Sequence, residues 1–496
     1  MLIAHDLGTS GNKATLVDDD GAMLASVTVS YGADWGSDGK AEQNPNDWWD
    51  ALCQATRDLI AKANVDADDI DAVGFSGQMM GVVPLDGEGD PVRPAIIWAD
   101  TRSTKQCDRL LSQVSMEDAY RITGHRLNPT YSLTKVMWMR DNEPDNFNRM
   151  EKFCLAKDYV AYKLTGVIAT DPSDASSTNA YDQAAKGWSE EIIGAADLDL
   201  SLFPDIVEST EVIGEVTREA AEATGLRPGT KVVIGGGDGP MAALGAGVID
   251  AASGAYACLG SSSWVSVASD EPLLDPKMRS MTFNHVIPGK FVPTATMQAG
   301  GASVSWAMEV LGEDRGYDAV LGDAAEVEAA LKGLFFLPYL IGERSPYWNP
   351  LARGVFAGLH MEHKQPHMVR AVLEGVTFNL LTGLEAFTDA GMKIDHIDAI
   401  GGLAKSSLMM RLMADIWGLP VAARNIVDEA NAIGAAVVAG VGAGIFDDFA
   451  ISKTLSKRSE DTVPNSERTE AYKRPYELFL NAYERIEPWF DDIAKL

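Results

Sequence analysis

The sequence is poor in basic residues and in paired cysteines. It has 41 Lys and Arg against 72 Asp and Glu, which gives a formal net charge of −31 and a pI near 4.5. Such a surface repels nucleic acid and anionic membranes, so neither is expected as a partner. Because none of the 4 cysteines lies in a CxxC pair, the sequence predicts neither a zinc site nor a disulfide framework.

Long apolar runs are also missing. Residues 232–260 come nearest to a membrane-spanning stretch, but glycines, Asp238 and Asp250 interrupt them. The N-terminus enters a strand pattern without a basic segment and a long apolar run before it, which argues against a signal peptide. We therefore expect a cytoplasmic protein.

Two common nucleotide-binding motifs are absent. There is no GxxxxGK[ST] P-loop. In the glycine run 235–239, Pro240 stands where the last glycine of a GxGxxG motif belongs, so a Rossmann cofactor site is unsupported. A nucleotide site in so acidic a chain would need helix N-termini, a few lysines and a divalent cation.

An internal repeat is present instead. Residues 2–25 and 255–270 both read as strand, glycine-rich turn and strand. A second pair of similar segments follows in the same order, DIDAVGFSGQ at 69–78 and HIDAIGGLAK at 396–405. Two pairs in one order are less easily explained by chance than either alone.

Each member of the second pair follows a helical pattern. Apolar residues recur at spacings of three, four and seven in 47–63 and 366–390, which marks one buried face of a helix. Helices alternating with strands imply α/β layers with mixed sheets. The length of 496 residues suits two large domains, which we place at 1–245 and 246–496 with a cleft between them.

The first glycine-rich turn carries phosphate-binding chemistry. A tight glycine turn lets backbone N–H groups approach phosphates. Thr9 and Ser10 add hydroxyls and Lys13 adds positive charge, while Asp6 ends a buried strand where it could hold a hydrated Mg²⁺. An ordinary Gly-Asn hairpin would use the same residues, and the motif alone does not decide between the two.

The turn formed by Gly260, Ser261 and Ser262 repeats this device in the second half. Taken alone, such a turn would be structural. Its match to the first hairpin predicts that two phosphate-binding turns face each other across the cleft and hold one triphosphate.

Asp238 follows three glycines at the end of a buried strand, 231–234. A carboxylate in this place, with glycines that leave room for a ligand, can act as a general base. Helix capping is the alternative role. Three consecutive glycines are more than a cap requires, so we favour catalysis.

A further glycine pair suggests where a nucleoside would bind. Gly401 and Gly402 end another strand, and with Lys405 they open a helix where a flat adenine ring and ribose could enter. Asn431 begins a helix of small residues that can pack close to such a ring. Tight helix–strand packing would use the same small residues.

Taken together, these segments resemble the FGGY family of carbohydrate kinases, and most of all its xylulokinase branch. The resemblance covers nearly the whole chain. Its segments are HDLGTSGNK at 5–13, GFSGQMMG at 74–81, RPAIIWADTRS at 93–103, LTGVIATDPSDASST at 164–178, the run 211–240 that ends in GGGDGP, ERSPYWNPLARGVFAGL at 343–359, the run 401–421 that begins GGLAKSS, and EANAIGAAVVAG at 429–440.

The resemblance implies two ribonuclease H-like domains of the actin/hexokinase type and an ATP-dependent kinase that phosphorylates a small sugar with Mg²⁺. It also implies roles for single residues. These are Asp238 as catalytic base, Asp6 near the metal, Thr9 and Lys13 in the first phosphate segment, Gly260, Ser261 and Ser262 in the second, Gly401, Gly402 and Lys405 at the adenosine site, and Met79 and Met80 at the sugar.

Two positions depart from the xylulokinase pattern. Met80 stands where such kinases carry histidine, and Gly239 where they carry asparagine. A thioether is a weak acceptor that mostly packs, so two polar sugar contacts are missing. The residues we expect to contact the sugar are Gln78, Met79, Met80, Asp100, Arg102, Tyr131 and Asp238.

A pentulose such as D-xylulose is the first expectation for the substrate. Glycerol, erythritol or gluconate is the alternative within the same chemistry. A non-catalytic actin-like ATPase or sensor is the alternative from another class, but Asp238 argues against it, since such a protein needs no base. A homodimer is possible and nothing in the sequence decides it.

Overall fold

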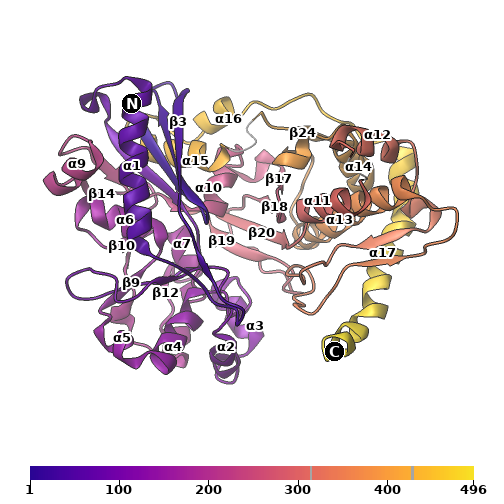
Figure 1. The fold of residues 1–496 in the computed structure, drawn as a ribbon, viewed down its shortest axis with the longest axis horizontal. Helices are drawn as coiled ribbons and strands as arrows, with labels where there is room; N and C mark the ends of the chain where they lie inside the picture. Colours follow the sequence, from indigo (N-terminus) through magenta and orange to yellow (C-terminus); the bar gives the residue numbers. More distant parts are fainter. Residues whose placement is uncertain (313–314, 426–428) are drawn as a thin grey trace.

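The computed structural model describes residues 1–312, 315–425 and 429–496. Two α/β halves lie side by side in it (Figure 1). The first half contains most of the indigo to magenta elements and the second most of the salmon to yellow ones, but the orange-yellow helices α15 (Ala430–Ala443) and α16 (Ile451–Leu455) lie beside the first half. This agrees with the predicted fold class of two ribonuclease H-like domains, each built on a mixed sheet.

The first sheet has the order β14-β15-β6-β1-β2-β3, with β16 paired to β6. Its β1–β2 hairpin is antiparallel and β6 runs parallel to β1, as the repeat predicted. The strands are β1 (Leu2–Leu7), β2 (Gly11–Val17), β3 (Met23–Ser30), β6 (Ala72–Gly77), β14 (Val212–Glu215), β15 (Lys231–Val233) and β16 (Gly236–Gly237).

The second sheet has the order β19-β20-β18-β17-β23-β24. Again a hairpin, β17–β18, is antiparallel, and β23 runs parallel to its first strand. The internal repeat is therefore confirmed as a structural duplication. The strands are β17 (Ala255–Leu259), β18 (Ser263–Val267), β19 (Met281–Asn284), β20 (Phe291–Met297), β23 (Ile397–Ile400) and β24 (Val421–Ala423).

Helices cover the sheets and form the outer layers. The two helices predicted at 47–63 and 366–390 are present as α1 and α13. The helices are α1 (Pro45–Ala63), α6 (Ala156–Thr165), α9 (Arg218–Thr224) and α10 (Asp238–Gly245) in the first half, and α11 (Gly301–Leu311), α12 (Tyr317–Ala325), α13 (Gln365–Asp389), α14 (Ser407–Trp417), α15 (Ala430–Ala443), α16 (Ile451–Leu455) and α17 (Ser466–Ile493) in the second.

A smaller layer of short elements extends the first half below its sheet (Figure 1). Its helices are α2 (Thr104–Leu111), α3 (Met116–Thr123), α4 (Ser132–Asn142), α5 (Pro144–Arg149), α7 (Pro172–Ser176) and α8 (Glu190–Ala195). Its strands are β4 (Asp34–Trp35), β5 (Ala41–Gln43), β7 (Val83–Leu85), β8 (Ala95–Ile96), β9 (Lys152–Cys154), β10 (Ala169–Thr170), β11 (Tyr181–Asp182), β12 (Gly187–Trp188) and β13 (Asp205–Ile206). In the second half, β21 (Phe335–Leu337) pairs with β22 (Val355–Ala357).

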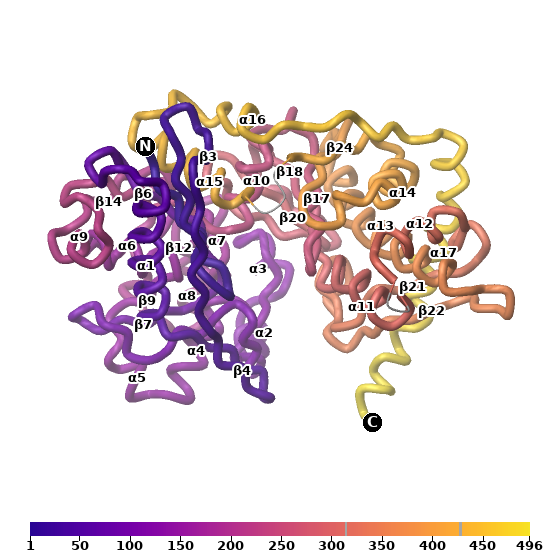
Figure 2. The backbone as a smooth tube through the Cα atoms, turned by 45° about the horizontal axis from the view of Figure 1, so that its top comes forward, coloured from indigo at the N-terminus to yellow at the C-terminus, as the bar shows by residue number. Residues whose placement is uncertain are grey.

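The two halves share one of the buried cores. Helix α15 belongs to the second half by sequence but packs on β1 and β6 of the first sheet and on α10. A Cβ atom on Gly434 would come within 2.2 Å of the Met241 carbonyl oxygen, so only glycine allows this helix pair to approach so closely. Figure 2 shows the chain returning from α16, beside the first half, to α17 on the far side.

Helix α17 carries aromatic residues at helical spacing near the C-terminus. Tyr472, Tyr476, Phe479 and Tyr483 are buried against the second half, whereas Trp489 is 55% exposed and does not contribute to this core. Among the described residues, no helix is both long enough and apolar enough to cross a membrane.

Candidate active site

The first turn lies between β1 and β2 and brings the predicted phosphate-binding residues together. Asp6 and Lys13 are direct partners in the hairpin register. The Thr9 hydroxyl accepts a hydrogen bond from the Trp98 indole at 2.9 Å, and Ser10 lies exposed at the tip of the turn. The Lys13 ammonium lies 3.9 Å from the Glu429 carboxylate.

Asp6 lies at the end of β1 with its carboxylate partly exposed. One oxygen accepts a hydrogen bond from the Ser76 hydroxyl at 2.8 Å, and both lie 3.3 Å from the Asn431 amide nitrogen. Burial raises the pKa of Asp6, whereas Ser76, Asn431 and Lys13 lower it. The carboxylate is thus oriented by neutral donors and retains lone pairs for a further partner.

Asp238 is the first residue of α10 and is partly exposed. Burial raises its pKa to about 7, and the negative charge of Asp6 contributes to this rise. Within the part of the chain that the structure describes, its side chain has one hydrogen bond, donated by the Gly239 N–H at 2.8 Å. A carboxylate with a pKa near neutrality and free lone pairs is suited to proton abstraction.

The three glycines before Asp238 have another reason than the one expected from the sequence. If Gly235 were alanine, its Cβ would lie 1.9 Å from the Phe75 carbonyl oxygen, and a Cβ on Gly237 would lie 2.7 Å from Met79. A Cβ on Gly236 would lie 2.6 Å from the Ser173 hydroxyl. The glycines therefore let neighbouring protein atoms approach the strand, and the room-for-ligand interpretation is wrong.

The second turn, Gly260 to Ser262, sits on the N-terminus of α11. The Gly260 carbonyl accepts from the Gly301 N–H at 2.8 Å, and the Ser261 carbonyl from the Ala302 N–H at 3.0 Å. A cavity of about 770 Å³ opens beside it. Its lining combines the second turn with the segment predicted for adenosine: Gly260, Ser261, Gly402 and Lys405, together with Tyr317 and Asp318 of α12.

Ser262 and Gly401 do not line this cavity. Gly401 instead passes close to β17, where a Cβ would lie 2.8 Å from the Leu259 carbonyl carbon. Asn431, which was also expected at the nucleoside, does not line this cavity either. Its amide reaches Asp6, and the small residues after it serve the packing of α15 on α10, so the expectation that they line the adenine ring is not supported.

Gln78 connects the sugar segment to the first turn. Its amide nitrogen donates to the Gln43 side chain at 2.8 Å, and the Gln43 amide donates to the Thr9 carbonyl at 2.8 Å. The Gln78 amide oxygen is buried without a hydrogen-bond partner in the described residues. Such an atom can accept a bond from a substrate hydroxyl. Gln43 carried no motif that would have marked it in the sequence.

Met79 and Met80 lie in an apolar cluster built from both halves. The cluster joins them to Tyr131 of the first half and to Met281 and Phe283 of β19. Met80 has a φ of 64°, its N–H donates to the Ser177 hydroxyl, and its carbonyl accepts from the Lys135 ammonium at 2.8 Å. The Met80 side chain therefore packs, as expected for a thioether.

The hydroxyl of Tyr131 is already engaged within the protein. It lies 3.0 Å from the His125 Nδ1 and 3.3 Å from the Met281 sulfur, and the residue is only 2% exposed. Direct contact between Tyr131 and a sugar therefore remains a prediction.

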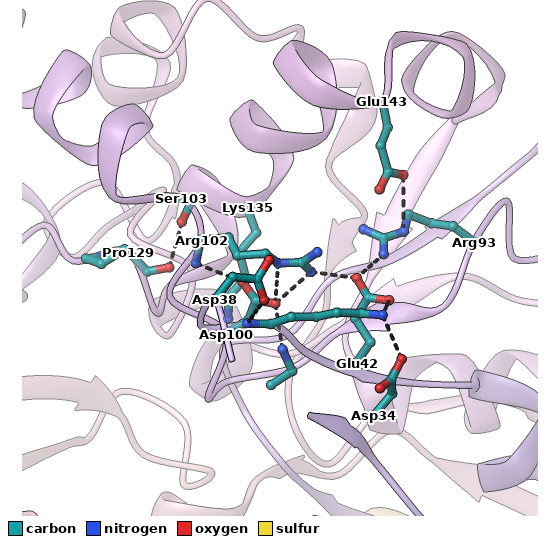
Figure 3. A network of polar contacts seen from close by, with 12 residues as sticks. Asp34, Asp38, Glu42, Arg93, Asp100, Arg102, Ser103, Pro129, Lys135 and Glu143 are labelled. Atoms are coloured by element: carbon teal, nitrogen blue, oxygen red, sulfur yellow. Dashed lines mark hydrogen bonds and ion pairs between the residues drawn. The ribbon is translucent and has the colours of Figure 1, made fainter. Parts of the chain in front are cut away.

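Asp100 and Arg102 also have internal partners (Figure 3). The Asp100 oxygens accept from the Ala41 N–H and from the N–H and Nε of Arg102, at 2.8–3.0 Å. The Arg102 guanidinium also reaches Glu42 at 2.5 Å and stacks over Trp138 at 4.3 Å. Both side chains are therefore held by internal contacts, and direct sugar contact by either one remains a prediction.

A segment of the second half reaches the same cluster. Trp348 packs against it, and its indole donates to the Met278 carbonyl at 3.1 Å. Burial lowers the pKa of Lys135 to about 7, and the positive charge of Arg344, four residues before Trp348, contributes to this fall. The sequence showed ERSPYW as part of the resemblance but gave no reason to place it beside Met80.

The pattern of the whole chain matches known proteins. Residues 1–245 match the N-terminal domain, and residues 255–443 the C-terminal domain, of the FGGY family of carbohydrate kinases. The chain belongs to this family. It is therefore an ATP-dependent sugar kinase, as the resemblance implied.

Individual FGGY kinases are similar over their full length. The xylulose kinase of Bacillus subtilis is 33% identical, over 97% of this chain and 96% of its own. A gluconokinase of Bacillus licheniformis is 28% identical, over 99% and 97%. The crystal structure of a ligand-bound xylulose kinase from Lactobacillus acidophilus superposes with a TM-score of 0.94 at 26% identity, covering 99% of both chains.

Proposed function

We propose that this FGGY kinase transfers the γ-phosphate of ATP to a hydroxyl of a pentulose, with D-xylulose as the first choice. The observation that carries the proposal is the full-length similarity to proteins named xylulose kinase, at 33% identity for one from Bacillus subtilis. The apolar side chains of Met79 and Met80 and the unpartnered amide oxygen of Gln78 suit a small, uncharged sugar.

Asp238 is the proposed general base. With its pKa near 7 it is largely ionised above neutrality, where it can take the proton from the attacking hydroxyl. The hydroxyl oxygen then attacks the γ-phosphorus and ADP leaves. We propose that the first turn, in domain 1–245, and the second turn, in domain 246–496, hold the phosphates. The cavity lined by Gly402 and Lys405 is proposed to hold the nucleoside.

Asp6 is the proposed contact for Mg²⁺. The part of the chain that the structure describes has no cluster of three or more His, Cys, Asp or Glu side chains that could hold a metal. A single carboxylate still fits this ion, since Mg²⁺ in kinases is bound largely by phosphates and water. Bound there, the cation would neutralise β- and γ-phosphate charge that this acidic chain would otherwise repel.

An aldonate such as gluconate is the second candidate, and one observation favours it. Near the sugar cluster, Arg344 precedes Trp348 by four residues and the Arg126 guanidinium lies over the Trp348 ring, and burial lowers the pKa of both arginines. Neither forms an ion pair with any described residue. The charges of Glu343 and Glu117 act on Arg344 and Arg126, respectively, without forming an ion pair. In a chain of charge −31, two desolvated arginines of this kind are suited to bind an anionic substrate.

Release of ADP, measured with D-xylulose, other pentuloses, glycerol, erythritol and D-gluconate, tests the proposal. The highest kcat/KM with D-xylulose would support the first choice, and the highest with D-gluconate the second. Arg344→Met separates them further. It should lower kcat/KM for gluconate about 10–100-fold if the guanidinium binds a carboxylate, and change it little for D-xylulose.

Met80→His tests whether the departure from the xylulokinase pattern matters. If the true substrate is not D-xylulose, a histidine that can hydrogen-bond sugar hydroxyls should raise kcat/KM for D-xylulose relative to that substrate. No such gain, combined with D-xylulose as the best wild-type substrate, would mean that Met80 is neutral.

A further inference from the structure

The segment Asp171–Ser177, which contains helix α7, lies where three parts of the chain meet. Three of its serines each accept a hydrogen bond from a backbone N–H of a different part: the strand before Asp238, strand β19 of the second sheet, and the sugar segment. The pairs are Gly237 N to Ser173 Oγ at 2.9 Å, Asn284 N to Ser176 Oγ at 3.1 Å, and Met80 N to Ser177 Oγ at 3.2 Å.

The proton of each serine hydroxyl is used inside the segment itself. Ser173 donates to the Asp171 carboxylate at 2.6 Å, Ser176 to the Ser173 carbonyl at 2.8 Å, and Ser177 to the Asp174 carbonyl at 2.7 Å. Because a hydroxyl has one proton, this leaves only its lone pairs to face outwards. All three serines are fully buried, so water cannot replace them as acceptors.

A buried ion cluster anchors the segment. The Lys157 ammonium lies 2.5 Å from Asp158, 3.0 Å from Asp171 and 3.2 Å from Asp174, and all four side chains are 0% exposed. Burial raises the pKa of Asp174 well above its usual range, whereas the charge of Lys157 lowers it. Separating one member from such a cluster would leave a buried charge unpaired, which is energetically costly. The cluster therefore holds the segment Asp171–Ser177 firmly in place.

We propose that Ser173 is a positioning residue for the base: held by Asp171, it fixes the Gly237 N–H and thereby the backbone from which Asp238 projects. The inference rests on the proposed role of Asp238. Among the strands that the structure describes, β16 pairs only with β6, over the two residues Gly236 and Gly237. Displacement of a catalytic group by about 1 Å can cost about 10²-fold in rate, so one such bond can matter.

Ser209 provides a matched control. Its hydroxyl also donates to the same Asp171 oxygen, at 2.7 Å, and the residue is buried, but no backbone N–H of the described chain donates to that hydroxyl. Ser173→Ala and Ser209→Ala each remove one donor from Asp171. We expect Ser173→Ala to lower kcat about 10–100-fold with unchanged KM for sugar and ATP, and Ser209→Ala to keep wild-type kcat. Equal kcat in the two variants would overturn the inference.

The pH profile gives a readout that a merely structural role would not change. In Ser173→Ala, a relaxed Asp238 should be better solvated, so the acid limb of kcat/KM should shift from about 7 towards the range of an ordinary carboxylate. Ser209→Ala should keep the wild-type limb. If Ser173→Ala does not fold, Ser173→Cys keeps the shape with a weaker acceptor and should show a smaller loss of kcat and a smaller shift of the acid limb in the same direction. A wild-type profile and kcat in the Cys variant would overturn the inference.

Asp238→Asn separates this inference from the proposed function. Near wild-type turnover of Asp238→Asn would remove the base assignment itself. An inactive Asp238→Asn combined with a Ser173→Ala variant that behaves like Ser209→Ala would leave the base in place and reject only the positioning role.

Discussion

The two halves share the order of five strands, β15-β6-β1-β2-β3 in the first and β24-β23-β17-β18-β20 in the second, but differ in the chemistry at equivalent positions. In the first hairpin, Asp6 and Lys13 are register partners. An offset of 260 − 8 = 252 places Cys258 at the position of Asp6. The register partner of Cys258 is Trp264, which therefore stands where the first hairpin has Lys13. Burial raises the pKa of Cys258 to about 12, so this thiol stays neutral. The duplication kept the backbone turn and placed the charges in one half only.

This difference indicates a division of labour. The first half has the charged groups suited to phosphoryl transfer, since Asp238 also lies there. The second half offers backbone groups and a cavity of about 770 Å³ suited to the nucleoside. Changes to charge in the first half should therefore cost more than changes to side chains in the second.

Asp238→Asn is expected to have the largest effect. The substitution is nearly isosteric but removes the proton acceptor, so kcat should fall about 10²–10⁴-fold while nucleotide binding is kept. Because the pKa of Asp238 is raised from 3.8 to about 7, ionisation costs stability as pH rises through this window, and Asn removes the cost. The variant should melt at a higher temperature than wild type at a pH above this window. Turnover near the wild-type value would reject the role.

Asp6→Ala and Cys258→Ala compare equivalent positions in the two halves. Asp6→Ala should lower kcat about 10²-fold, with less effect on sugar KM, because the proposed contact to the cation is lost. Cys258→Ala should keep near wild-type turnover. Steady-state kinetics over a Mg²⁺ titration measures both, and wild-type activity in excess EDTA would contradict the need for the cation.

The pH dependence follows from the raised pKa of Asp238. The base must be ionised, so kcat/KM should fall about tenfold for each pH unit below about 7 and level off above it. Measuring kcat/KM from about pH 5 to about pH 9 with saturating Mg²⁺ gives the acid limb of the profile. A profile that stays flat across the acid range would mean that another group limits the rate.

Closure of the two halves is a smaller, structural prediction. The two turns belong to different halves, so both can hold one triphosphate only if the halves approach, which also excludes water. Small-angle scattering with D-xylulose and a non-hydrolysable ATP analogue should show a lower radius of gyration than the free protein. The same radius in both states would argue against closure.

Gly402→Ala should have the smallest effect, and Gly401→Ala serves as its contrast. Nothing lies within 4 Å of a Cβ on Gly402, so stability should not change, but KM for ATP should rise if the nucleoside lies in the cavity. Gly401 has a φ of 92° and a close contact with β17, so alanine there should cost about 1–3 kcal/mol of stability. An unchanged KM for ATP in Gly402→Ala would mean that the nucleoside does not bind in this cavity.

The sequence by itself determined the repeated framework and several of its functional positions. The β1–β2 and β17–β18 hairpins, helices α1 and α13, and the placement of Asp238 after a buried strand all followed from local patterns. The physical reason is that backbone hydrogen bonding and burial impose fixed periods on strands and helices, and glycine marks their turns. Those signals lie within a few residues of one another and can be read without a structure.

Only the tertiary structure decided which distant residues meet. Asn431 reaches Asp6 across 425 positions, Arg344 and Trp348 reach the cluster around Met80, and Asp100 is already bonded to Arg102 and Ala41. The glycines before Asp238 are explained by their contacts with Phe75, Ser173 and Met79. Side chains with no local motif, such as Lys157 and Ser173, gain their roles from burial beside partners that other segments supply. Their partners depend on how the two sheets and α15 pack together, and no period in the sequence records that packing.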